Sequence, residues 1–123
     1  GPARTLGART ILHYMHQLNQ VEKLPTILMG DMNAGPDSAA IRLLRNNLHD
    51  YPDIHLQSIY DSLDPSGIFG TYHGFKGRKG KSPIDYIFFT EEFQVENAYI
   101  DTTSLDGLYP SDHYPLVADL CLR

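Results

Sequence analysis

The run of residues 84–90 constrains the fold more than any other feature of this sequence, because it is apolar on both faces of the strand that it predicts. Alternation places Tyr86 and Phe88 on one face and Ile87 and Phe89 on the other. A strand of this kind has to be covered on both sides. Helices can cover one side, but a chain of 123 residues has no obvious second layer for the other.

Hydrophobic patterning predicts two helices and several further strands within a single domain, residues 1–123. One helix is expected over residues 4–20, and a second runs from Asp37 or Ser38 to about Asn46. The second helix has an apolar side made of Ile41, Leu44 and Leu48. The other expected strands are 26–29, a short one at 71–73, 94–102 and 115–122, whereas 49–68 is expected to be irregular. This order predicts an α/β fold with helices on one face of a mixed sheet.

Composition excludes several classes of protein. A formal net charge of −5 argues against a protein that coats nucleic acid by bulk electrostatics. No apolar run approaches the roughly 20 residues that a membrane-spanning helix needs, so a soluble chain is expected. The single cysteine, Cys121, forms no internal disulfide and gives no sign of an oxidising compartment. The first residues show no signal-peptide pattern, but they look cut, so the location is left open with the cytoplasm slightly favoured.

Polar residues stand at the ends of three expected strands. Asp31 and Asn33 follow the first strand, Asp85 lies at the start of 84–90, and Asp112 and His113 precede the last strand. Loops at strand ends commonly hold functional groups. Carboxylate and amide oxygens suit hard cations such as Mg²⁺, and a histidine fixed by a carboxylate can transfer protons near neutral pH. Together these residue types predict metal-assisted attack of water on a phosphoester.

Simpler interpretations exist for each polar group. Asp31 and Asn33 are residue types favoured in turns. An Asp112-His113 pair in a loop can be merely solvated. Asp85 is harder to explain in this way, because burial of an unpaired carboxylate is costly. It requires a partner, and His113 is the natural candidate.

Three other site types fail on particular residues. A P-loop ending at 80–82 would need glycine where Phe75 stands, and a strand follows instead of a helix. A calcium loop beginning at Asp31 would need glycine at Pro36 and glutamate at Arg42. The consecutive Ser-Asp-His residues 111–113 cannot converge as a catalytic triad.

Four segments together resemble, in order and spacing, motifs of the endonuclease/exonuclease/phosphatase family, the family of DNase I. They are Gly30-Asp31-Met32-Asn33-Ala34, Gly70-Thr71-Tyr72-His73-Gly74-Phe75, Pro83-Ile84-Asp85-Tyr86-Ile87-Phe88 and Ser111-Asp112-His113-Tyr114-Pro115-Leu116. The resemblance runs from about Ala3 to Leu122. It implies that the chain is the C-terminal half of a DNase I-like four-layer α/β sandwich.

The resemblance also implies roles for five residues. Asp31 would orient or deprotonate the attacking water or hold a metal, and Asn33 would bind the scissile phosphate. His113, held by Asp85, would contact the phosphate and stabilise the transition state. Asp112 would join Asp31 in the metal site, with Mg²⁺ or Mn²⁺ as the cation.

Substrate contacts are expected near a glycine-rich basic loop, residues 74–82. Lys76 and Arg78 either touch substrate phosphates or are simply solvated, and His73 either contacts substrate or makes a structural hydrogen bond. The family's substrates include nucleic acids, lipids and sugar phosphates, so the fold does not name the substrate.

The resemblance further implies that the other half of the fold supplies an Asn, a metal-binding Glu and a His-x-Asp motif. This sequence has none of the three, so the chain is expected to be a truncated piece with low or absent activity alone. A non-catalytic binding or assembly module is the alternative. An uncovered apolar sheet face also predicts a homodimer, with a second copy in place of the absent half.

Overall fold

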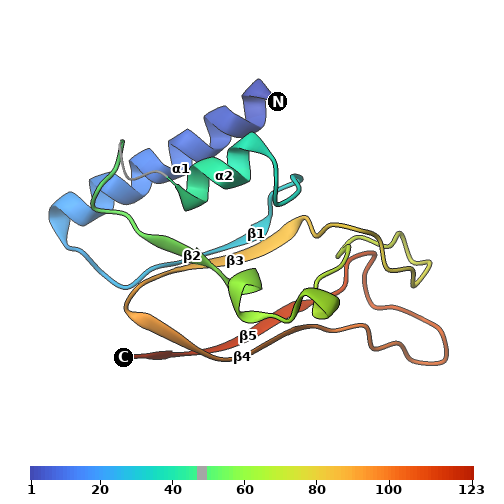
Figure 1. Cartoon of the computed structure of the whole chain (residues 1–123). Coiled ribbons are helices and arrows are strands. Elements are labelled where there is room, and N and C mark those ends of the chain that lie inside the picture. The colour runs from blue at the N-terminus through green and yellow to red at the C-terminus, as the bar shows by residue number, and fades with distance from the viewer. Residues whose placement is uncertain (47–49) are drawn as a thin grey trace.

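The computed structural model describes residues 1–46 and 50–123, and in these ranges the chain forms three layers (Figure 1). Two helices cover one face of a three-stranded sheet, and a two-stranded sheet lies beneath the opposite face. The elements in chain order are α1 (Pro2–Val21), β1 (Ile27–Asp31), α2 (Ala39–Arg45), β2 (Leu56–Ser58), the short 3₁₀ helices η1 (Ile59–Ser62) and η2 (Pro65–Gly67), β3 (Asp85–Thr90), β4 (Phe93–Ile100) and β5 (Leu116–Leu122).

Both helices occur where the apolar periodicity predicts them. The buried side of α1 consists of Ala8, Leu12 and Met15, and α1 begins two residues early because proline is favoured in a first turn. Ser38 caps α2, with its Oγ accepting the Ile41 N–H at 3.4 Å. The buried residues of α2 include Ile41 and Leu44, whereas the expected contribution of Leu48 lies outside the described residues. Neither helix is long and apolar enough to cross a membrane.

The three-stranded sheet has the order β1-β3-β2 and is antiparallel throughout, so the predicted mixed sheet is wrong. A parallel pair would require β2 to lie beside β1 after the crossover through α2, but β2 pairs with the far edge of β3 instead. β2 itself lies in a stretch that we expected to be irregular. With only three residues, it is too short for alternation to reveal it.

The second layer comes from the same chain, which corrects the expectation that none was available. β4 and β5 pair with each other and lie beneath β3 (Figure 1). Ile87 and Phe89 of β3 are buried. The cross-strand partners of these two residues on β1, Met29 and Ile27, remain 64% and 44% exposed. The homodimer was predicted from an uncovered apolar sheet face. That face is covered at β3 and uncovered at Ile27 and Met29 of β1.

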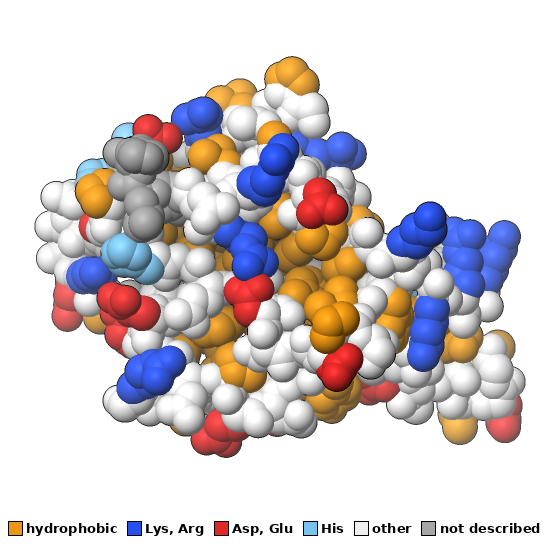
Figure 2. Space-filling view, viewed as in Figure 1, with side chains coloured by type: hydrophobic (Ala, Val, Ile, Leu, Met, Phe, Trp, Pro, Cys, Tyr) orange, Lys and Arg blue, Asp and Glu red, His pale blue; other side chains and the backbone are white. Residues whose placement is uncertain are grey.

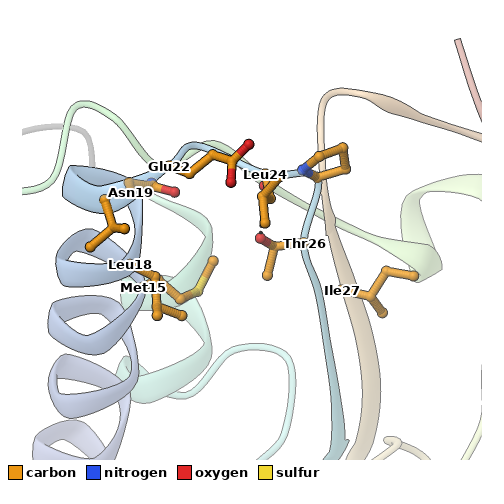
Figure 3. Close-up of a pocket in the computed structure, with 9 residues that line it drawn as sticks. Met15, Leu18, Asn19, Glu22, Leu24, Thr26 and Ile27 are labelled. Carbon is orange, nitrogen blue, oxygen red and sulfur yellow. Dashed lines mark hydrogen bonds between the residues drawn. The ribbon is translucent and has the colours of Figure 1, made fainter.

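An open apolar groove of about 420 Å³ lies near the start of β1 (Figure 3). Asp31 is at the other end of this strand. The lining of the groove includes Met15 and Leu18 from α1, Leu24 from the connection that follows α1, and Ile27 at the start of β1. It is therefore separate from the polar residues at the end of β1.

Candidate active site

The ends of β1 and β3 and the loop before β5 bring three carboxylates to one imidazole. Asp31 and Asp85 are direct cross-strand partners at the last paired position of β1 and β3. His113 Nδ1 lies 2.7 Å from Asp85 Oδ2, which is the partnership that the sequence indicated. The other ring nitrogen, Nε2, lies 3.9 Å from Asp31 Oδ2 and 4.0 Å from Asp112 Oδ1. All four side chains are partly exposed, so a ligand can reach them.

The surroundings of His113 favour its charged form. The hydrogen bond to Asp85 raises the pKa of His113 most, partial burial opposes the increase, and the negative charges of Asp85, Asp31 and Asp112 add to it. Without a bound cation, the imidazole is therefore protonated to a higher pH than a free histidine. With Nδ1–H held by Asp85, the Nε2–H is the proton that faces a ligand.

Asp85→Asn is expected to lower the pKa of His113 toward the ordinary histidine value. The substitution removes both the charge-assisted hydrogen bond and the nearest negative charge. A pH titration of the imidazole C–H resonances by NMR measures the change, with Asp119→Asn on β5 as a control that leaves the pKa unchanged. A raised histidine pKa contributes stability that is fully present below the unfolded pKa and is lost as pH rises through the folded pKa. The variant therefore loses that pH dependence. An unchanged His113 pKa in Asp85→Asn contradicts the pairing.

Thr71 holds the backbone next to both Asp85 and His113, a role that the sequence did not predict. Its fully buried Oγ1 accepts the N–H groups of Ile84 and Asp85 at 3.0 and 3.3 Å. Its carbonyl oxygen accepts the Tyr114 N–H at 2.6 Å. One residue thus fixes the backbone on both sides of the Asp85–His113 contact. The one hint in the sequence is that Thr71 lies in the segment 70–75, which resembles a motif of the family.

The expected short strand 71–73 is a single bridge between Tyr72 and His113. The bridge is too short to count as a strand, because the chain turns again at Gly74. It nevertheless joins the 70–74 segment to the loop that carries Asp112 and His113.

Asp31 and Asn33 form the turn that their residue types favour. Asp31 Oδ1 accepts the backbone N–H of Asn33 at 2.8 Å, and Asn33 has a left-handed φ of 49°. The other carboxylate oxygen, Oδ2, is the one that faces His113. The turn and the approach to the imidazole therefore use different oxygens of one carboxylate.

His73 is fully buried, which is the position expected of a histidine that makes a structural hydrogen bond. Its ring stacks on that of Tyr114 with centroids 4.1 Å apart, and its Nδ1 accepts the Gly77 N–H at 3.3 Å. Its Nε2 has no hydrogen-bond partner in the described part of the chain. The sequence cannot show this burial, because it depends on the distant Tyr114.

The basic loop extends from the end of the molecule at which the chain enters β5 (Figure 1). Lys76 and Arg78 are exposed, and Figure 2 shows Lys and Arg side chains gathered over this end. The carbonyl oxygen of Arg78 accepts the Tyr114 hydroxyl at 2.9 Å, and the Gly70 N–H donates to the Gly80 carbonyl at 2.7 Å. The loop backbone is therefore anchored next to His113, while the side chains of Lys76 and Arg78 are exposed.

The donor set fits a hard divalent cation. Ligand atoms of Asp31, Asp85 and His113 lie within 4.8 Å of one another. Mg²⁺ requires only one or two protein carboxylates and keeps several waters. Within this group Asp85 Oδ2 is hydrogen-bonded to His113 Nδ1, and Asp31 Oδ2 lies 3.9 Å from His113 Nε2. Mn²⁺ accepts the same oxygen donors.

A protein-family model and several solved structures match this chain. A family model described as "Endonuclease/Exonuclease/phosphatase family" matches residues 17–113. No curated protein sequence matches the chain significantly. Among solved structures, a conserved protein of unknown function from Enterococcus faecalis V583 is 29% identical with a TM-score of 0.75. The alignment covers 98% of this chain and 45% of that one.

Two further structures share the fold. The human Nocturnin catalytic domain is 25% identical with a TM-score of 0.73, covering 98% of this chain and 41% of that one. A mannosyl-6-phosphatase from Bacteroides thetaiotaomicron VPI-5482 is 24% identical with a TM-score of 0.77, covering 99% and 47%. The chain thus spans slightly less than half the length of these structures.

Proposed function

Because this chain belongs to the endonuclease/exonuclease/phosphatase family, we propose that it carries the C-terminal part of a metal-dependent phosphoester hydrolase site. The observation that supports this most is the His113 imidazole, which Asp85 holds at Nδ1 while Nε2 faces Asp31 and Asp112. The substrate class is a phosphomonoester or phosphodiester, such as a nucleic acid, lipid or sugar phosphate. The proposed catalytic residues are Asp31, Asn33, Asp85, Asp112 and His113.

His113 acts on the phosphate in this proposal. Its Nε2–H donates a hydrogen bond to a non-bridging phosphate oxygen and stabilises the negative charge that develops there in the transition state. Asp85 fixes the ring orientation and favours the protonated form, as its effect on the pKa of His113 indicates.

Asp31 and Asn33 act on the water and the phosphate. Asp31 Oδ2 accepts a proton from, or orients, the attacking water, while the Asn33 amide donates a hydrogen bond to the scissile phosphate. Asp31 and Asp112 would hold Mg²⁺ or Mn²⁺. When bound, such a cation polarises the phosphoester and lowers the pKa of a coordinated water.

Phosphate binding tests this proposal without requiring turnover. Isothermal titration of the chain with inorganic phosphate is expected to show binding that depends on Mg²⁺. Asp31→Asn, which removes the charge of a proposed ligand, is expected to weaken that binding at least about tenfold, in line with the loss of a charged hydrogen-bonding group. The exposed carboxylate of Asp119 offers the matched control Asp119→Asn, which leaves binding unchanged. Binding that needs no Mg²⁺, or that survives Asp31→Asn unchanged, argues instead for the non-catalytic module.

A further inference from the structure

A strained turn lies beside the candidate site. The His73 carbonyl accepts the Lys76 N–H at 3.0 Å, and the two residues between them, Gly74 and Phe75, have φ of 60° and 65°. Positive φ at both central positions with this hydrogen bond is the pattern of a type I′ turn. Glycine and asparagine accommodate it easily, whereas a bulky residue such as phenylalanine is an outlier there.

Packing within the chain does not account for Phe75 at this position. Its side chain is 62% exposed, and its described ring contact is a distant edge-on one with His73 at a centroid separation of 6.4 Å. A backbone conformation that disfavours phenylalanine therefore presents an apolar ring to solvent. This combination indicates that the ring serves a contact with a ligand.

The turn is held rigidly to the segment that carries the site. The N–H groups of His73 and Gly74 both donate to the Asp112 carbonyl, at 2.8 and 3.2 Å. The Gly77 N–H donates to the buried His73 ring. Phe75 is consequently kept in a fixed position relative to Asp112 and His113.

Tyr72 extends the aromatic surface toward His113. Its side chain is 45% exposed, and its ring meets the His113 ring edge-on with centroids 5.5 Å apart. The Tyr72 hydroxyl lies over Gly74, where an added Cβ would be 3.2 Å away. Tyr72 therefore lies against both the turn that carries Phe75 and His113, the group proposed to bind the phosphate.

We propose that Phe75 and Tyr72 form a stacking surface for a ring in the leaving group of the phosphoester. This rests on the proposed function, because His113 fixes the phosphate beside Tyr72. Exposed aromatic faces bind nucleobases and other rings by stacking. The neighbouring cations Lys76 and Arg78 suit a ligand with further negative charge. Nucleotides, and phosphates of sugars in their ring form, carry such a ring, whereas acyclic glycerol phosphates do not.

Titration calorimetry of the chain with Mg²⁺ tests the proposal with four ligands. They are inorganic phosphate, adenosine 5′-monophosphate, mannose 6-phosphate and glycerol 3-phosphate. At least one ring-bearing ester is expected to bind about tenfold more tightly than glycerol 3-phosphate, the magnitude of one stacking contact. The first two esters distinguish a nucleobase from a sugar ring as the preferred group. Equal affinity for all three esters overturns the proposal.

Two substitutions of Phe75 separate ligand contact from folding. Phe75→Ala is expected to abolish the preference for ring-bearing esters while leaving inorganic phosphate binding unchanged. Phe75→Gly removes the ring and the backbone strain together, so it is expected to lose the same preference while unfolding at an equal or higher temperature. Tyr14→Ala removes a similarly exposed aromatic from α1 and serves as the matched control. Retention of the preference in either Phe75 variant overturns the proposal.

The outcomes also distinguish this proposal from the proposed function. If inorganic phosphate itself does not bind in the presence of Mg²⁺, the hydrolase proposal fails and the stacking proposal falls with it. If inorganic phosphate binds but the ring-bearing esters gain nothing over glycerol 3-phosphate, only the stacking surface is wrong.

Discussion

The isolated chain is expected to hydrolyse phosphoesters at least about a thousandfold more slowly than the roughly 10 s⁻¹ typical of enzymes. The site in this chain holds one histidine and three carboxylates, of which Asp85 is engaged with His113. The family resemblance implies that a metal-binding Glu, an Asn and a His-x-Asp motif come from the remainder of the fold. Groups that act as one catalytic unit lose most of their effect when part of the unit is missing.

A turnover assay with Mg²⁺ on bis-p-nitrophenyl phosphate and p-nitrophenyl phosphate measures this expectation. His113→Ala is the control that identifies contaminating phosphatase, because any rate that survives the substitution does not arise at this site. Turnover near 10 s⁻¹ that disappears in His113→Ala would show that the residues of this chain are sufficient for catalysis.

Phe88→Ala is expected to reduce the free energy of unfolding by about 3–5 kcal/mol. Phe88 is fully buried at the centre of β3, pairs across the sheet with Leu28 and Ser58, and stacks on Tyr86 with centroids 5.4 Å apart. A small domain has only about 5–15 kcal/mol of stability in total, so this loss is a large fraction of the stability of the fold.

Thermal and urea unfolding followed by circular dichroism measure this loss. Tyr99→Ala truncates a half-exposed aromatic on β4 and is expected to cost less than about 1 kcal/mol. If Phe88→Ala costs no more than Tyr99→Ala, then β3 is not the centre of the fold. The position of Asp85 opposite Asp31 then has no support either, since both depend on the pairing of β1 with β3.

Local sequence patterns predicted the positions of most helices and strands, but they could not predict how the strands pair. The apolar stripe of α1 and the alternation in β3 predict these elements to within two residues at each end. The strand at β1 is displaced by two residues at its C-terminal end, because pairing with β3 continues as far as Asp31. Neither the antiparallel order of the sheet nor the packing of β4 and β5 beneath it is encoded in local periodicity.

In the candidate site, too, only the features with a local sequence signal could be predicted. The cost of burying a lone carboxylate identified Asp85 as needing a partner, and the structure places His113 there. The contacts of Thr71 could not be predicted, since they join its hydroxyl and carbonyl to backbone groups far along the chain. The positive φ of Phe75 could not be predicted either, because the sequence of a motif does not determine its backbone angles.

Paramagnetic broadening by Mn²⁺ in NMR spectra of the ¹⁵N-labelled chain locates the cation most directly. Trace Mn²⁺ is expected to broaden first the amide resonances at the end of β1, the start of β3 and residues 111–113, and excess Mg²⁺ is expected to reverse the effect. Asp31→Asn is expected to abolish it. Broadening that centres elsewhere, for example on the exposed Asp106, or that spreads uniformly over the chain, would contradict a cation site formed by Asp31 and Asp112.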